Sequence, residues 1–278
     1  FSPGYRNKIY EKEYEIPPYQ ESKIIFPVES DFINLATSYN ISIFVKDESG
    51  IEIKKEEEKG FRACEKAKGK IKIDGDLSDW HLNKLIPIPF EREFTTWGKK
   101  IKDEKDLSGK LYTVWDKDYL YFGVIVKDNS KVQRFNDINM WQDDNIMFGL
   151  YPWGWKKGEV LHSGYYREHL GLCKDGVARI FRVGAVSGGI QNAKEAKISV
   201  RKTEDGYIYE WAYPEKLVFP LELKEGSKFR LSMFILDRDK EKGKLSPLGG
   251  IQIGGFNENV DARPEKWREF ILTEGEEK

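Results

Sequence analysis

The stretch of sequence that decides the fold runs from residue 111 to residue 126 and reads LYTVWDKDYLYFGVIV. It contains two runs rich in aromatic and β-branched residues, 111–116 and 119–126, which meet at the polar residues Asp116-Lys117-Asp118. Two such runs joined by a short polar turn predict an antiparallel β-hairpin.

The same alternation of apolar and polar residues recurs along the whole chain. Short apolar-polar runs are bounded by Gly, Pro, Asp or Ser, at intervals typical of a β-sandwich, and no long helical periodicity interrupts them. Short helices are expected only at 76–85 and 213–218. The sequence therefore predicts an all-β protein, an antiparallel β-sandwich preceded by a small or partial β-sandwich segment, with a domain boundary near residue 66. The further predicted strands are 8–16, 23–28, 40–45, 51–53, 70–75, 145–151, 177–182, 196–200, 207–212, 228–236 and 270–272.

Composition excludes several classes of protein. The 278 residues include 46 Lys and Arg against 47 Asp and Glu, a net charge of −1, which disfavours a nucleic-acid partner. No apolar run approaches the roughly 20 residues that a membrane-spanning helix needs. The excess of Lys and Glu among the charges is compatible with a thermophilic source. The two cysteines, Cys64 and Cys173, lie far apart in the sequence and are interpreted as free thiols.

Several blocks of sequence resemble a known family when they are taken in order. They are IDGDLSDW at 73–80, the hairpin at 111–128, WQDDNIMF at 141–148, DGYIYEWAYP at 205–214, the strand at 229–237 and PEKWREF at 264–270. Together they resemble the family 9 carbohydrate-binding modules and the DOMON-like β-sandwiches, over residues from about 68 to 275.

The resemblance implies an antiparallel β-sandwich that holds structural calcium and binds sugar chains as an appendage of secreted glycosidases. Residues 67–278 are expected to form this module. Residues 1–66 resemble an immunoglobulin-like accessory domain of glycosidases and are expected to be a small or truncated β segment. The start at Phe1 indicates a processed product or a fragment, so other domains of a longer, secreted or cell-surface parent chain are expected as partners, with a polysaccharide or oligosaccharide as ligand.

The sugar-binding residues are predicted to be tryptophans, because a sugar ring has apolar faces that stack on aromatic rings. Trp141 matches the first of two tryptophans that sandwich a sugar in the family. The second has no counterpart in residues 257–263, so either the ligand differs or the site is lost. Trp153 and Trp155 flank a glycine and share a face if extended, which offers a replacement platform. Trp267 is interpreted as core packing.

The calcium ligands implied by the resemblance are Asp74, Asp76 and Asp79 around a tight turn, with Asp128 at a strand end. Hard cations take several oxygen ligands, mostly carboxylates and carbonyls. Without the resemblance, the Asp-Gly-Asp sequence at 74–76 is equally typical of turn chemistry.

Catalysis finds little support in the sequence. The three histidines fit no zinc motif, and there is no nucleophile elbow, phosphate loop or dinucleotide fingerprint. The preferred hypothesis is a non-catalytic carbohydrate-binding module that stacks sugar on an exposed Trp. The alternatives are a structural or assembly domain of a cell-surface protein that binds no sugar, and a glycosidase in its own right.

Overall fold

The computed structural model describes residues 9, 11–13, 15, 38–47, 49–90, 92–94, 98–153, 164–254, 264 and 267–275. Contacts divide the chain into two units, Phe1–Asn34 and Leu35–Lys278, and the elements below belong to the second. The strands predicted at 8–16 and 23–28 lie largely outside the described residues.

The described elements are mainly β-strands, as predicted. They are β1 (Ser38–Lys46), β2 (Glu52–Lys66), β3 (Ile88–Pro89), β4 (Arg92–Phe94), β5 (Leu107–Trp115), β6 (Tyr119–Asp128), β7 (Asn145–Tyr151), β8 (Tyr166–Leu172), β9 (Ala178–Gly184), β10 (Lys197–Lys202), β11 (Gly206–Pro214), β12 (Lys228–Asp237), β13 (Lys240–Glu241), β14 (Lys244–Leu245), β15 (Gly249–Ile253) and β16 (Arg268–Thr273). Short 3₁₀ turns connect them: η2 (Leu77–Trp80), η3 (Leu82–Lys84), η4 (Ile138–Gln142) and η5 (Glu215–Leu217).

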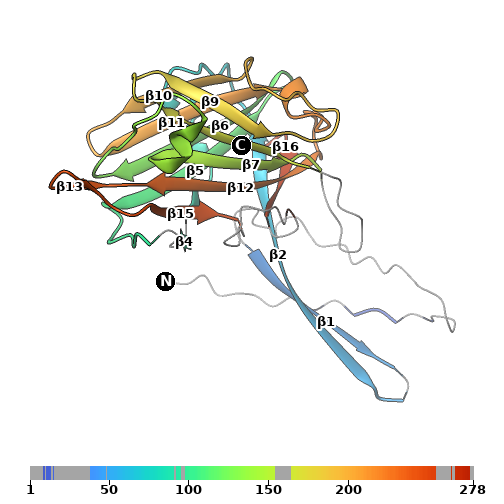
Figure 1. Cartoon of the computed structure of the whole chain (residues 1–278). Coiled ribbons are helices and arrows are strands. Elements are labelled where there is room, and N and C mark those ends of the chain that lie inside the picture. Colours follow the sequence, from blue (N-terminus) through green and yellow to red (C-terminus); the bar gives the residue numbers. More distant parts are fainter. Residues whose placement is uncertain are drawn as a thin grey trace. The chain divides into compact units, whose positions relative to one another are not determined.

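One large sheet contains most of these strands. Its order is β10-β11-β6-β5-β2-β16-β12-β7-β8-β9, and the two end strands contact each other, so the sheet nearly closes on itself (Figure 1). Neighbours in this order are antiparallel, except that β2 runs parallel to both β5 and β16. The result is a β-sandwich whose halves, β5-β6-β11-β10 and β12-β7-β8-β9, are joined through β2 and β16.

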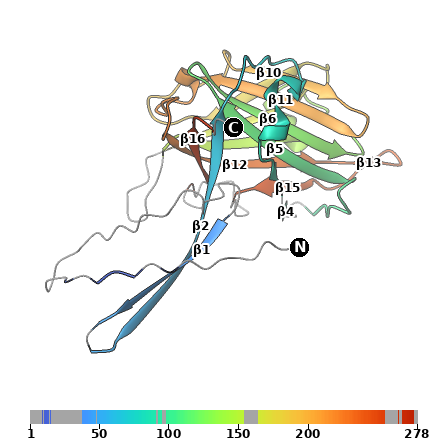
Figure 2. The same cartoon turned by 180° about the vertical axis from the view of Figure 1, so that it is seen from behind.

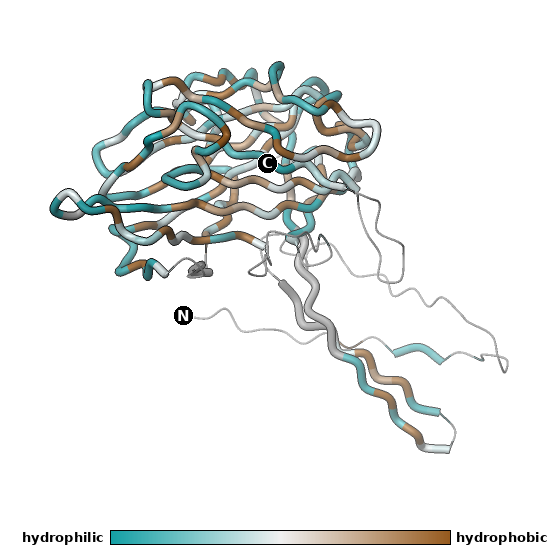
Figure 3. The backbone as a smooth tube through the Cα atoms, in the orientation of Figure 1, coloured by the Kyte–Doolittle hydropathy of each residue, from teal (hydrophilic) through white to brown (hydrophobic). Residues whose placement is uncertain are grey.

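An aromatic core fills the space between the two halves. The ring of Phe122 on β6 lies 5.0 Å from that of Phe148 on β7 and 5.3 Å from that of Trp211 on β11. Phe148 also stacks on Tyr213, at 5.7 Å. Because successive side chains of a strand point to opposite faces, the alternation visible in Figure 3 directs one apolar set into this core.

The outer face of β5, β6 and β11 is covered by the segment that contains η2 and η3 (Figure 2). Leu77 and Trp80 of η2 are each 3% exposed and pack on this face. Gly123 on β6 makes room for them, because a Cβ there would lie 3.0 Å from the Leu77 side chain and 3.4 Å from the Trp80 ring.

A buried carboxylate fixes the same segment to the sheet. Glu210 on β11 accepts hydrogen bonds from the backbone N–H groups of Asp74 (2.9 Å) and Gly75 (2.8 Å) and from the indole N–H of Trp80 (2.8 Å). Two of the sequence blocks that carry the family resemblance, 73–80 and 205–214, therefore meet at one side chain.

Some sequence predictions need correction. Residues 70–75 form no strand, because a carboxylate rather than a neighbouring strand accepts the backbone N–H groups at their end. The two predicted helices are only 3₁₀ turns. Strand β8 was missed, because its mid-strand charges hide the apolar alternation; Glu168 is buried there and pairs with Arg182 of β9 at 2.6 Å.

The start of the module is continuous with a long hairpin. Strand β2 pairs along its first part with β1 and along its last residues with β16 and β5, so it belongs to the large sheet. Independent folding on either side of residue 66 stays a prediction. Cys64 on β2 and Cys173 are both buried and unbridged, which confirms the free-thiol interpretation. Among the described residues, no helix has the length and apolarity to cross a bilayer.

Candidate functional site

Trp141 lies on the 3₁₀ turn η4, between β6 and β7, and its side chain is 39% exposed. The turn begins at Asp137, whose carboxylate caps the backbone N–H of Asn139 at 2.9 Å. Met140, the residue before Trp141, is fully buried and anchors the turn in the protein. The tight turn therefore directs the side chain of Met140 into the protein and the indole of Trp141 toward solvent.

Hydrogen bonds hold the turn from both sides. The side-chain amide of Gln133 donates to the carbonyls of Met140 (3.2 Å) and Asp144 (3.0 Å). The amide of Asn145 donates to the carbonyls of Met140 (3.1 Å) and Asp143 (2.7 Å). Because these bonds fix the backbone on each side of Trp141, the exposed indole has a preorganised position, which lowers the entropic cost of binding a ligand.

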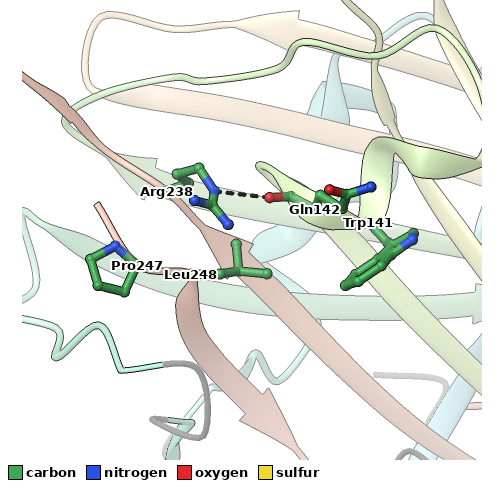
Figure 4. A pocket seen from close by; sticks show the side chains of 5 residues that line it. All are labelled: Trp141, Gln142, Arg238, Pro247 and Leu248. Carbon is green, nitrogen blue, oxygen red and sulfur yellow. Dashed lines mark hydrogen bonds between the residues drawn. The ribbon is translucent and has the colours of Figure 1, made fainter. Parts of the chain in front are cut away.

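A surface pocket of about 280 Å³ opens beside the Trp141 ring (Figure 4). Its lining is Trp141, Gln142, Arg238, Pro247 and Leu248. It combines an aromatic face, two apolar side chains and a guanidinium group. This combination suits a ligand that carries both an apolar face and hydroxyl groups.

Arg238 follows β12 and forms the polar wall of the pocket. Its Nε donates to the carbonyl of Gln142 at 2.9 Å and lies 3.2 Å from an oxygen of Asp143, while its Nη1 donates to the carbonyl of Ser246 at 2.8 Å. Asp143 is fully buried and also pairs with Arg134 at 2.8 Å. These bonds hold the guanidinium in place with 19% of the side chain exposed.

The other tryptophans differ in position. Trp153 is partly buried, its ring lies 5.0 Å from that of Tyr151, and it packs against the apolar clusters. Trp155 lies outside the described residues, so the two-Trp platform predicted around Gly154 stays a prediction. Trp267 is 3% exposed and packs edge-on against Tyr165, in agreement with its interpretation as core.

A second constellation lies close to the pocket and consists of buried and half-buried carboxylates. Two groups of three aspartates have oxygens within 4.8 Å of one another, Asp106-Asp237-Asp239 and Asp128-Asp144-Asp237. They come from the residue before β5, the end of β6, the residue before β7, and the end of β12 and the loop after it. We call these five residues the carboxylate cluster.

The negative charges of the carboxylate cluster destabilise one another, because the carboxylates lie close together and away from water. Burial raises the pKa of Asp128 to about 6 and that of Asp237 to about 7, and neighbouring carboxylates contribute to both rises. Burial and the charge of Asp128 also raise the pKa of Asp144 well above its ordinary value. Burial alone would lower the pKa of Lys99, but its bonds to Asp237 and Asp239 outweigh this effect and raise it.

The four predicted calcium ligands lie in two different places in the structure. Asp128 lies in the carboxylate cluster. Asp74 and Asp76 accept hydrogen bonds from backbone N–H groups two residues further on, at 2.9 and 3.0 Å, and Asp79 accepts one from Lys72 at 2.8 Å. Within the described ranges, these three join no group of three acids close enough to share one ion.

The pocket and the carboxylate cluster are directly linked. The carboxylate of Asp144 accepts the backbone N–H of Arg238 at 2.7 Å and that of Val132 at 2.5 Å. Asp144 thus joins the turn that carries Trp141 to the residue that forms the polar wall.

The fold and the pocket define a β-sandwich with a ligand-sized surface site beside one of its loops. No model of a known protein family matches the chain, and no curated protein matches it. Solved structures of similar fold do match the chain. A family 9 carbohydrate-binding module from Caldicellulosiruptor kristjanssonii in complex with cellotriose has a TM-score of 0.57 at 13% identity and covers 78% of this chain and 96% of its own. The same organism's family 9 module in complex with glucose has a TM-score of 0.53 at 13% identity, with 78% and 98% covered. The chain therefore has a family 9 carbohydrate-binding-module-like fold.

Sequence reasoning missed most of this site. Arg238, Lys99 and four members of the carboxylate cluster were not singled out as ligands. Asp143 and Asp144 are adjacent in the sequence, but their side chains separate, one to Arg134 and the other to Val132 and Arg238. The available signal was the position of aspartates at strand ends, at 128, 144 and 237.

Proposed function

We propose that this protein is a non-catalytic carbohydrate-binding module and that it stacks a sugar ring on Trp141. The observation that carries the proposal is an exposed indole, on a turn held by hydrogen bonds, beside the guanidinium of Arg238 in a pocket of about 280 Å³. The apolar face of a sugar would lie on the ring, while its hydroxyls would accept hydrogen bonds from the guanidinium. The sugar-bound structures of similar fold support a sugar as the ligand class.

The pocket is too small for a long chain to be buried in it. Pockets for drug-sized ligands enclose about 300–1,000 Å³, so this one lies at the lower limit and suits one sugar unit. We propose that it contacts a single residue of an oligosaccharide or polysaccharide. Beyond the pocket, the parent protein is proposed to be a longer, secreted or cell-surface polysaccharide-acting chain.

The fold family implies calcium, and the carboxylate cluster fits such an ion. Its donors are all carboxylate oxygens, the ligands that calcium prefers. Oδ1 of Asp237 and of Asp239 are buried and accept no hydrogen bond from the part of the chain that the structure describes. We propose that Asp128, Asp144 and Asp237 help to hold a structural calcium, which would neutralise their charge and fix the ends of β6, β7 and β12.

Sugar binding is tested by comparing Trp141→Ala with Ile138→Ala. Ile138 lies on the same turn, is 38% exposed and does not line the pocket, so it is a matched control. Binding is measured by calorimetry with glucose, cello-oligosaccharides and xylo-oligosaccharides and by pull-down on insoluble glucan and xylan. Trp141→Ala should weaken binding about 5- to 150-fold, because stacking and apolar contact contribute about 1–3 kcal/mol, and Ile138→Ala should change it less than about 2-fold.

Two results would favour the alternatives. If the unmodified chain binds nothing on a broad glycan panel, the domain is structural and the proposal fails. If the chain instead releases reducing sugar from these substrates, and Trp141→Ala releases it equally well, the protein is a glycosidase whose catalytic site lies elsewhere.

A further inference from the structure

Lys99 occupies a position that resembles that of a bound cation. Its side chain is 5% exposed, and its ammonium bonds to Asp237, to Asp239 at 2.8 Å, and lies 3.8 Å from an oxygen of Asp106. The three carboxylates come from two segments of the chain, the one before β5 and the end of β12 with the loop after it, and converge on one positive charge. Buried charges are stabilised only when they are paired in this way.

The adjoining group, Asp128-Asp144-Asp237, shares Asp237 with the first. No described ammonium lies within hydrogen-bonding distance of these oxygens other than that of Lys99 on Asp237. The ammonium of Lys131 is buried nearby, but it forms no hydrogen bond with a described group and lies over the ring of Tyr207, at 4.6 Å. This second group therefore has converging oxygens without a cation among them.

We propose that two cations share the carboxylate cluster: the Lys99 ammonium between Asp106, Asp237 and Asp239, and one divalent ion between Asp128, Asp144 and Asp237. Lys99 acts as a tethered cation that fills what would otherwise be a second ion position. The inference deepens the calcium proposal and rests on it, but it is independent of sugar binding.

Charge and hydrogen bonding support this division. Four buried carboxylates and the half-buried Asp128 face only two lysines, so without another cation the cluster would hold uncompensated charge at high cost. The buried Oδ1 atom of Asp237 accepts no hydrogen bond from the described residues, which identifies an oxygen available to an ion. Asp237 can serve both cations, because its two oxygens are separate ligands.

The division predicts how many ions the chain binds. The whole chain is stripped with EDTA, desalted and titrated with CaCl₂ by calorimetry, and the bound ions are counted by elemental analysis. The unmodified chain should bind about one ion. Lys99→Ala should bind about two, because three carboxylates are left without their ammonium. Lys99→Arg keeps the positive charge and should still bind about one.

A second set of variants keeps the test decisive if Lys99→Ala does not fold. Asp144→Asn should lose the ion, whereas Asp239→Asn, which alters only the ammonium's group, should retain it. Loss of the ion in Asp239→Asn would overturn the division. So would a count of two in the unmodified chain, or a count of one in a folded Lys99→Ala. No ion in the unmodified chain would overturn the calcium proposal itself.

Discussion

Glu210 offers the most direct test of how the family-like sequence blocks stabilise the fold. The carboxylate is fully buried and accepts three hydrogen bonds, two from backbone N–H groups and one from the Trp80 indole. Glu210→Ala removes both acceptor oxygens and with them all three hydrogen bonds. An unsatisfied buried donor costs about 1–3 kcal/mol, and water entering the vacated space recovers part of the loss, so we expect unfolding to require about 3–5 kcal/mol less free energy. This is a large fraction of the 5–15 kcal/mol typical of a domain.

The assay is urea unfolding followed by tryptophan fluorescence, with an unchanged m value as evidence that compactness is preserved. Glu210→Gln keeps one acceptor oxygen and should lose an intermediate amount. Glu222→Ala removes an exposed partner of Lys224 and should leave the urea midpoint unchanged. A loss below about 1 kcal/mol in Glu210→Ala would refute the argument that this carboxylate anchors residues 73–80.

Further predictions concern pH, packing and metal. Burial and a neighbouring arginine lower the pKa of His169 to about 4 in the folded protein. As the pH falls below about 6.5, this imidazole is therefore protonated in the unfolded chain before it is protonated in the folded one. Stability should therefore drop by up to about 3 kcal/mol between pH 6.5 and 4, and His169→Gln should remove that part of the slope. An unchanged slope in His169→Gln would contradict the assignment. Gly149→Ala would place a Cβ 2.6 Å from the Trp267 ring and should cost about 1–3 kcal/mol in urea unfolding, whereas Gly69→Ala, with open space around it, should be neutral. Calcium at 100-fold excess over its Kd should raise the Tm by about 5–10 °C relative to EDTA and should strengthen sugar binding; identical melting and affinity under both conditions would exclude a stabilising ion.

Much of the fold could be read from local pattern. The strand predicted at 145–151 matches β7, and that predicted at 228–236 ends one residue before β12. Both are short runs rich in apolar residues, and β7 is buried along its whole length. The pattern failed where burial is achieved by pairing charges. Strand β8 carries Glu168 and His169 in its middle, and their burial depends on neighbours from other strands that no local window contains.

The residues that line the pocket were only partly accessible to sequence reasoning. Trp141 could be predicted, because an isolated Trp among polar residues precedes a clear strand and matches a family block. The polar wall could not, because Arg238 lies 97 positions further on and reaches the turn only through the pairing of β7 with β12, in which Leu236 lies opposite Asn145.

The sequence by itself determined the all-β class, the order of the main strands and the exposed Trp, since alternation and turn residues act over a few positions. Only the tertiary structure decided which charges lie together. Lys99 and the five aspartates of the carboxylate cluster are spread from residue 99 to residue 239, and strand register alone brings them within reach of one another. Electrostatic interactions depend on distance in space, so a balanced net charge of −1 reveals nothing of a buried group with more carboxylates than lysines.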